Sequence, residues 1–256
     1  MRPQGASPTG KIAGIIPARW GSTRLPQKMM ADVAGKPLIV RTLEAAKRAS
    51  TLDFVLVATD DDRLAKAIRS AGGEAVLTDP ALPSGSDRIW AAAQEFDADI
   101  LVNLQGDEPM MPPEVIDTTV RLLLDHPEFD LTTAATCLKA KDLDNPDVVK
   151  VVVDMRGKAL YFSRAPIPFP RGNEPPATLF RRHIGLYVYR RETLQAFCGW
   201  EPSPLESTER LEQLRLLEHG RSIGVADVEC DLIGVDTEED LARVRTHFEQ
   251  IEAGNG

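Results

Sequence analysis

The stretch KIAGIIPARWGSTRLPQKMM, residues 11–30, decides the fold. It opens with a short apolar run bounded by Pro17, which is typical of a buried parallel strand. The chain then becomes a loop of small residues that carries Arg19, Arg24 and Lys28. In open α/β sheets, ligands bind at the carboxyl ends of the strands. Cations and small residues suit a polyphosphate there, although a solvated basic loop would give the same pattern.

Strand and helix patterns alternate along the first half of the chain. Apolar runs at 54–58, 75–77 and 100–104 predict three further strands, separated by helical segments. This alternation indicates a parallel sheet with right-handed crossovers, and hence the α/β class.

The second half has a different rhythm. Three β-rich segments lie close together at 131–138, 148–154 and 159–163, and another strand is predicted at 183–189. A helix is predicted at 205–219. We therefore expect a mostly parallel central sheet with a smaller mixed α/β insertion that covers the sheet edge.

The domain organisation follows from these patterns. We expect a single domain over residues 11–250, whose insertion lies within 131–220. The polar, Pro- and Gly-rich residues 1–10 and the tail 251–256 are expected to be disordered.

Composition narrows the function. Among 256 residues, 39 are acidic and 30 are basic, giving a net charge of −9, which argues against nucleic acid or an anionic membrane as a partner. No apolar run approaches the roughly 18 residues of a membrane span, and residues 1–10 contain no signal-peptide segment. The three cysteines show no zinc-type spacing. A cytoplasmic protein is the default expectation.

Acidic residues follow several of the predicted strands. Asp107 and Asp236 each stand just past an apolar run that is predicted to be a strand, at the edge where the basic loop emerges. Two carboxylates that meet there would hold Mg²⁺ against a triphosphate, whereas singly each is explained as a turn or cap residue. Asp60, Asp61 and Asp62 follow the second strand, and consecutive acids point in different directions, so helix capping is favoured over metal binding.

The chain resembles the 3-deoxy-manno-octulosonate cytidylyltransferases (CMP-Kdo synthetases) from about residue 11 to about residue 248. The resemblance rests on the order of many short motifs, each of which is weak alone. They are PAR (17–19), STRLP (22–26) with Lys28, VATD (57–60), SGSDR (84–88), QGDEP (105–109), YFSRAPIP (161–168), HIGLYVYR (183–190), SPLE (203–206), LEQLRLLEHG (211–220) and GVDTEEDL (234–241).

The resemblance implies a Rossmann-like nucleotidyltransferase and a reaction. The anomeric hydroxyl of Kdo attacks the α-phosphorus of CTP, diphosphate leaves, and CMP-Kdo forms with Mg²⁺ for lipopolysaccharide biosynthesis. The family also implies a homodimer with part of the insertion at the interface.

Roles in the nucleotide site are implied by motif. The resemblance assigns the triphosphate to PAR and STRLP with Lys28, and the cytosine end to SGSDR; QGDEP contributes one further residue. The residues are Arg19, Ser22, Arg24, Lys28, Ser84, Arg88 and Gln105. The metal ions are assigned to Asp107 and Asp236. Together with Lys28 and Arg24, these two carboxylates form the catalytic set.

Roles in the sugar site rest mainly on the same resemblance. They fall to six residues: Gln105, Arg164, His183, Tyr187, Glu212 and Gln213. Arg164 suits the Kdo carboxylate, and the others suit its hydroxyls. His183 and Tyr187 are four apart on a predicted strand, so they face the same side.

Two positions depart from the family pattern. Gln27 stands where the family usually has Gly, which serves close backbone approach or a positive φ. Leu82 stands where the family usually has His. Both departures bear on the nucleotide site, and neither removes a proposed metal ligand or phosphate-binding cation.

Rival interpretations remain at this stage. A cytidylyltransferase for 8-amino-Kdo has the same motifs, while one for a sialic acid fits the sugar-site motifs less well. A glycosyltransferase would present D-x-D at a strand end, and Gln105 stands in place of the first Asp. A non-catalytic nucleotide-binding regulator would not need Asp107, Asp236 and Lys28. A dehydrogenase is disfavoured because no G-x-G-x-x-G follows the first strand.

Overall fold

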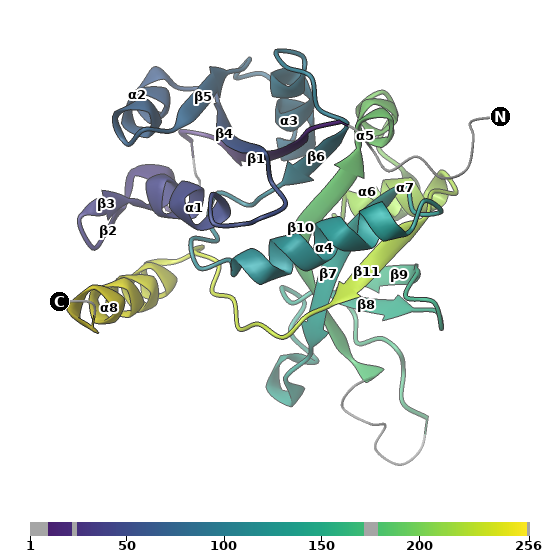
Figure 1. The fold of residues 1–256 in the computed structure, drawn as a ribbon. Coiled ribbons are helices and arrows are strands. Elements are labelled where there is room, and N and C mark those ends of the chain that lie inside the picture. The colour runs from purple at the N-terminus through teal and green to yellow at the C-terminus, as the bar shows by residue number, and fades with distance from the viewer. Residues whose placement is uncertain (1–9, 22–24, 172–178, 255–256) are drawn as a thin grey trace. The chain divides into compact units, whose positions relative to one another are not determined.

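A computed structural model describes residues 10–21, 25–171 and 179–254 of the chain (Figure 1). Within them, residues 10–117 and 231–254 form a larger compact unit, and residues 118–230 form a smaller one. The insertion predicted at 131–220 falls inside the smaller unit.

The larger unit is built on a parallel sheet. Its strands are β1 (Ile12–Ala18), β4 (Phe54–Thr59), β5 (Glu74–Leu77) and β6 (Ile100–Asn103), in the spatial order β6-β1-β4-β5. The four apolar runs predicted as strands in the first half of the chain are confirmed. β1 continues through Pro17, one residue past the predicted boundary, and pairs with β4 as far as Ala18–Thr59.

The order of the strands creates a switch point. The chain moves from β1 outward to β4 and β5, and then returns to place β6 on the other side of β1. At such a reversal, the connections after the two neighbouring strands diverge and leave a crevice at their carboxyl ends. The basic loop after β1 and the acidic turn after β6 both emerge at this edge.

Helices follow the strands of the larger unit, and two of them begin at side-chain caps. The helices are α1 (Leu38–Ala46), α2 (Asp62–Ser70), α3 (Gly85–Ala93) and the first part of α4 (Pro113–Asp125), which contains the boundary between the units. Asp61 caps α2 by accepting from the Arg63 amide, as the capping prediction required. Ser84 caps α3 in the same way.

Residues 32–37 form a small hairpin. Strands β2 (Asp32–Val33) and β3 (Lys36–Pro37) are joined by Ala34 and Gly35, whose φ angles are 49° and 78°. Two consecutive positive φ angles are the requirement of a type I′ turn. Pro37 ends β3 and precedes the first residue of α1, so the helix begins at Leu38.

The carboxy-terminal segment returns to the larger unit. Helix α8 (Glu238–Gly254) follows a capping box in which Thr237 and Asp240 exchange side-chain-to-backbone hydrogen bonds. The strand predicted to end at Asp236 is wrong, because residues 228–236 form no strand. The start of the tail predicted at 251 is wrong too, because α8 continues to Gly254.

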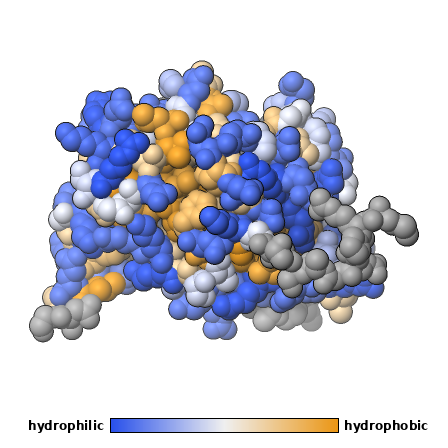
Figure 2. Space-filling model, turned by 45° about the horizontal axis from the view of Figure 1, so that its top comes forward, coloured by the Kyte–Doolittle hydropathy of each residue, from blue (hydrophilic) through white to orange (hydrophobic). Residues whose placement is uncertain are grey.

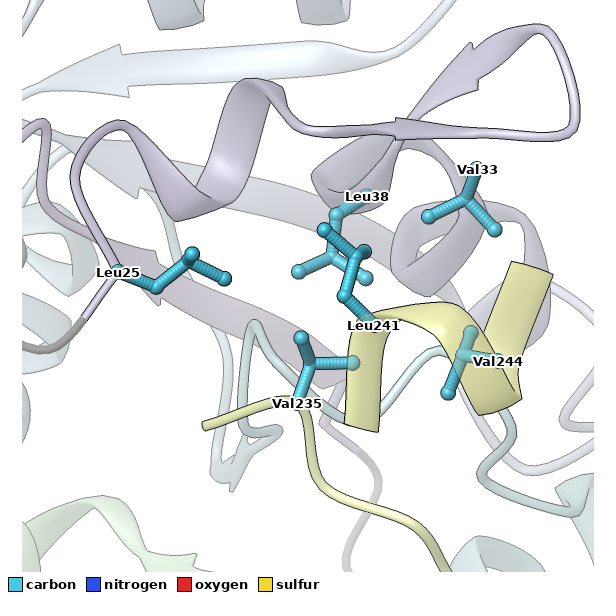
Figure 3. Close-up of a cluster of buried hydrophobic side chains, with 6 residues drawn as sticks. All are labelled: Leu25, Val33, Leu38, Val235, Leu241 and Val244. Carbon is cyan, nitrogen blue, oxygen red and sulfur yellow. The ribbon is translucent and has the colours of Figure 1, made fainter. Parts of the chain in front are cut away.

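A hydrophobic cluster holds this segment in place. Figure 3 shows side chains from the basic loop, the hairpin, α1 and the carboxy-terminal segment pointing toward one another. Its members are Leu25, Val33, Leu38, Val235, Leu241 and Val244. Arg41 reinforces the contact, because its guanidinium pairs with Glu252 and lies over the Phe248 ring.

The smaller unit contains a mixed sheet. Its strands are β7 (Leu131–Cys137), β8 (Lys150–Val153), β9 (Ala159–Ser163), β10 (Arg181–Arg190) and β11 (Ile223–Asp227). β11 pairs with β7 in parallel, whereas the β10–β7, β10–β8 and β8–β9 pairs are antiparallel. The short 3-10 helix η2 (Ala140–Asp142) follows β7.

Helices of the smaller unit are short. They are α5 (Arg191–Cys198), α6 (Pro204–Glu209) and α7 (Gln213–Glu218). The single helix predicted at 205–219 is wrong, because Arg210 adopts a left-handed conformation with φ 53° and ends α6. The α5 helix was not predicted.

The surface carries the charged and polar residues that are frequent in the sequence. Figure 2 shows hydrophobic residues among a largely hydrophilic face. Across residues 10–21, 25–171 and 179–254, no helix is both long and apolar enough to cross a bilayer. The parallel sheet and its crossover helices confirm the predicted α/β class.

Candidate active site

Lys28 begins the short 3-10 helix η1 (Lys28–Met30) after the basic loop. Leu25, in the cluster of Figure 3, accepts a hydrogen bond from the Lys28 amide at 3.1 Å, so the loop is anchored just before the lysine. Gln27 has φ 56° and ψ 28°, the left-handed conformation for which glycine is best suited. The left-handed backbone at this position explains why glycine suits it.

Asp107 lies in the turn that follows β6. The carbonyl of the preceding Gly106 accepts a 2.8 Å hydrogen bond from Thr42 Oγ1 of α1. The carbonyl of Asp107 itself accepts a 2.9 Å hydrogen bond from the Val235 amide. Gln105 lies in the same turn, and its carbonyl accepts from the amide of Glu108 at 3.2 Å.

Asp236 reaches the same place from the carboxy-terminal segment. Val235 is buried in the cluster of Figure 3, and Thr237 begins the capping box of α8. Asp236 is therefore fixed on both sides, by apolar packing before it and by a helix cap after it.

These three side chains meet at one point. Lys28 Nζ lies 2.6 Å from Asp107 Oδ2 and 3.2 Å from Asp236 Oδ1. The Lys28 side chain is only 9% exposed, so its charge acts in a partly desolvated place. Two carboxylates on one cation satisfy the sequence prediction that Asp107 and Asp236 converge on the edge where the basic loop emerges.

The donor set fits a magnesium ion. Both carboxylate oxygens lie within hydrogen-bond distance of the same nitrogen, so a small cation in that neighbourhood would reach both. Within the described ranges of the chain, no group of three or more His, Cys, Asp or Glu side chains is arranged to hold a metal ion. Mg²⁺ usually takes one or two carboxylates and completes its shell with water and substrate phosphates, which matches this pair.

The remaining residues assigned to the nucleotide site have different surroundings. Arg19 is exposed and donates through Nη2 to the carbonyls of Pro83 at 2.9 Å and Leu82 at 3.3 Å. Ser22 and Arg24 lie outside the described residues. Ser84 uses its hydroxyl within the α3 cap, donating to Asp87 Oδ2 at 2.7 Å.

Arg88 is fully buried, at 0% exposure. Its guanidinium donates to Thr78 Oγ1 at 2.5 Å and to Asp60 Oδ2 at 3.3 Å. Burial lowers the pKa of Arg88, with the charge of Asp60 acting in the opposite direction. From the sequence, Arg88 is assigned to the nucleotide site by resemblance alone, and its ion pair with Asp60 is not predicted.

The proposed sugar residues other than Gln105 lie in the smaller unit. On β10, the rings of His183 and Tyr187 have centroids 5.5 Å apart, so the two residues do face the same side. Tyr187 OH donates to Gln213 Oε1 of α7 at 3.1 Å. Gln213 is 3% exposed, and within the described residues its Nε2 has no hydrogen-bond partner.

His183 is held as a neutral imidazole. Desolvation by burial lowers its pKa to about 3. Its Nε2 lies 2.9 Å from Thr133 Oγ1, whose single hydroxyl proton is directed at the carbonyl of Leu186 at 2.7 Å. His183 therefore donates from Nε2, which leaves Nδ1 as an acceptor.

Arg164 and Glu212 complete the predicted set. Arg164 donates from Nε to the Glu209 carbonyl and from Nη1 to the Pro146 carbonyl, both at 2.8 Å. The Lys150 ammonium donates to the Arg164 carbonyl at 2.7 Å. Glu212 is the half-buried residue that precedes α7.

A second buried ion pair was also missed by the sequence reasoning. Arg215 of α7 contacts Glu206 of α6 through Nε at 2.6 Å and Nη2 at 2.5 Å, and it lies over the Phe197 ring of α5. The acid and base stand nine residues apart across the break at Arg210, a spacing that continuous helical periodicity does not bring together. This pair joins the three short helices and sets the position of Gln213.

A parallel sheet whose switch point gathers a basic loop and paired carboxylates defines a nucleotide-binding α/β protein. A family model described as Cytidylyltransferase matches residues 13–223. Relatives named 3-deoxy-manno-octulosonate cytidylyltransferase from Chloroherpeton thalassium and Anaeromyxobacter sp. (strain K) are 48% and 49% identical, over 92% and 91% of this chain and 96% of each relative. The chain belongs to the 3-deoxy-manno-octulosonate cytidylyltransferase family.

Solved structures agree with this assignment. A CMP:2-keto-3-deoxy-manno-octonic acid synthetase complexed with CTP superposes with a TM-score of 0.90 at 41% identity, over 94% of this chain and 99% of that one. A 4-diphosphocytidyl-2C-methyl-D-erythritol synthase from Anaerococcus prevotii gives a TM-score of 0.61 at 14% identity, over 94% of this chain and 99% of that one. The second likeness shows the fold alone.

Proposed function

We propose that this protein transfers CMP from CTP to Kdo, releasing diphosphate and forming CMP-Kdo for lipopolysaccharide biosynthesis. The observation that carries the proposal is the convergence of Lys28 on Asp107 and Asp236 at the sheet's switch point. The CTP complex of the 41% identical synthetase supports the choice of nucleotide.

The nucleotide half of the mechanism is electrostatic. Negative charge builds up on the phosphorus oxygens as diphosphate leaves, and positioned cations offset it. Lys28 supplies a partly desolvated ammonium beside the carboxylates, and exposed Arg19 supplies a guanidinium whose Nη2 donates to two carbonyls. We assign Ser22, Arg24, Ser84, Arg88 and Gln105 to the same nucleotide site.

Mg²⁺ would be held by Asp107 and Asp236, where it supplies charge neutralisation and Lewis acidity to phosphoryl transfer. The acidic pair is held in place by backbone contacts on both segments, so it is organised before the nucleotide arrives. No side-chain base is proposed for the attacking hydroxyl.

Most of the residues that we assign to the sugar belong to the smaller unit. His183 Nδ1 would accept from a sugar hydroxyl, since Nε2 is committed to Thr133. Gln213 Nε2 would donate to another hydroxyl, and Tyr187 fixes the orientation of that amide. Arg164 suits the Kdo carboxylate with its remaining N–H groups, and Glu212 and Gln105 would add hydroxyl contacts.

We further propose a homodimer in the cytoplasm. The smaller unit exposes large apolar side chains at Met155, Leu160, Phe169 and Leu179, of which Met155 and Phe169 are 103% and 84% exposed. Exposed apolar groups of this size are typical of an interface, and a second copy of the chain is the partner that we propose for them.

Diphosphate release tests the function. CTP, UTP, ATP and GTP are each offered with Kdo, 8-amino-Kdo or N-acetylneuraminate, with Mg²⁺ and with EDTA. Release with CTP and Kdo, abolished by EDTA, is the expected result. Release only with CTP and another acid would reassign the sugar site, and release with a different nucleotide would contradict the nucleotide assignment.

A further inference from the structure

Asp60, the last residue of the VATD motif, lies between two parts of the nucleotide site. Its Oδ1 accepts a 3.0 Å hydrogen bond from the backbone amide of Trp20. Its Oδ2 accepts a 3.3 Å hydrogen bond from Nη2 of Arg88. One carboxylate therefore joins the loop after β1 to helix α3.

The contact with Arg88 neutralises the carboxylate. A lone acid beside a triphosphate would repel it, but the buried guanidinium compensates Asp60, whose own side chain is 13% exposed. Thr78 accepts from the same guanidinium and fixes it from the other side. The pair can therefore lie next to an anionic ligand while its carboxylate still accepts from the loop.

The contact with Trp20 is reinforced from α2. The guanidinium of Arg63 lies 3.5 Å from the centre of the Trp20 ring, and it is itself held by both oxygens of Asp61. The backbone of Trp20 is thus fixed by Asp60 while its indole is fixed by Arg63. Arg19, the residue before Trp20, reaches the carbonyls of the turn that leads to α3.

We propose that Asp60 is a positioning residue of the nucleotide site, which holds the Trp20 amide and thereby sets where Arg19 presents its charge to the triphosphate. The inference rests on the proposed use of CTP. It assigns a role to the first of three consecutive acids, of which the second caps α2 and holds the guanidinium of Arg63.

A matched pair of variants separates positioning from charge compensation. Asp60→Ala alone would leave Arg88 buried without its counter-charge, so the fold itself would be at risk. In Asp60→Asn/Arg88→Met and Asp60→Ala/Arg88→Met, that charge is removed from both proteins. The two differ only in whether residue 60 offers an acceptor to Trp20.

The expected result is a split between the two substrates. The KM for CTP should be about ten-fold higher in Asp60→Ala/Arg88→Met than in Asp60→Asn/Arg88→Met. The KM for Kdo and the thermal midpoint should agree between the two double variants. In the absence of nucleotide, hydrogen exchange at the Trp20 amide should be faster in Asp60→Ala/Arg88→Met than in the other double variant. Equal KM values for CTP, or equal exchange at Trp20, would overturn the proposal.

The two readouts also separate this inference from the proposed function. If wild-type protein releases no diphosphate from CTP, the proposed function fails. Measured on the same proteins, the exchange at Trp20 would still decide whether Asp60 holds the loop.

Discussion

The amide of Val235 donates a 2.9 Å hydrogen bond to the carbonyl of Asp107. This bond joins the two segments that carry the carboxylates of the site, although one follows β6 and the other precedes α8. Because the link is backbone to backbone, it is kept when either carboxylate is substituted. Either carboxylate can therefore be substituted while the backbone hydrogen bond between the two segments is kept.

Asp107→Asn and Asp236→Asn are each expected to lower kcat/KM by about 1,000-fold or more, because a neutral amide binds Mg²⁺ weakly and offsets no ammonium charge. Thermal midpoints should stay close to wild type, since Lys28 keeps its other carboxylate. Steady-state diphosphate release and a thermal melt measure both quantities.

The control for this pair is Glu44→Gln, which removes the exposed ion pair with Lys36 and should change neither quantity. Near-normal turnover in Asp107→Asn or Asp236→Asn would remove that residue from the metal site.

Gln27→Gly is expected to stabilise the protein by about 0.5–1 kcal/mol, because relief of the left-handed conformation exceeds the extra chain entropy of glycine. The φ of 56° is the reason for choosing this position. Urea unfolding compares it with Gln27→Ala, which keeps a Cβ and should give no gain. A loss of stability in the glycine variant would show that the Gln27 side chain makes a contribution of its own.

Much of the fold was predictable from local pattern. Apolar runs bounded by Gly, Pro and Asp marked every strand of the parallel sheet in the larger unit, and a cap of α2 was predicted among Asp60, Asp61 and Asp62. Residues 205–219 were predicted as one helix because the leucine spacing is helical, whereas Arg210 adopts a left-handed conformation that ends α6. The ion pair between Glu206 and Arg215 joins the two shorter helices, and periodicity does not reveal it.

The site was predictable to a different degree. Asp107 and Asp236 could be paired because each follows an apolar run, and the meeting point depended only on topology. Asp60 could not be separated from Asp61 and Asp62, since its role depends on Trp20 and Arg88, which lie 40 and 28 residues away. The sugar residues rested on resemblance, because no local pattern distinguishes them from ordinary strand and helix residues.

His183 is expected to make stability depend on pH. Its folded-state pKa is about 3, whereas an unfolded histidine titrates near 6.5. The unfolded state therefore binds the proton first as pH falls, so stability is full above about 6.5 and is lost progressively toward about 3. Between pH 7 and pH 5 this residue alone should remove up to about 2 kcal/mol from the free energy of unfolding.

Urea unfolding of His183→Gln at pH 7 and pH 5 checks this sign, since the variant should lose less stability than wild type. His247→Gln, on the exposed surface of α8, keeps His183 and should follow wild type. A steeper pH dependence in His183→Gln than in wild type would contradict the neutral imidazole.

Asp117 of α4 is expected to be among the most sensitive polar positions of the larger unit. Burial opposes its charge, but four hydrogen bonds from Ser50 and Thr51 outweigh the burial and lower the pKa of the carboxyl. These bonds tie the end of the α1 connection to α4. Asp117→Ala leaves two backbone amides and two hydroxyls without their acceptor, and it should cost about 2–4 kcal/mol in the free energy of unfolding.

Asp125→Ala, an exposed position on the same helix, is the matched control and should change stability by no more than about 0.5 kcal/mol. Chemical denaturation at pH 7 measures both variants, and activity per folded molecule should be unchanged in each, because neither residue belongs to the nucleotide or sugar site. An Asp117→Ala protein as stable as Asp125→Ala would show that water replaces the carboxylate at this connection, and that the four hydrogen bonds contribute nothing net to folding.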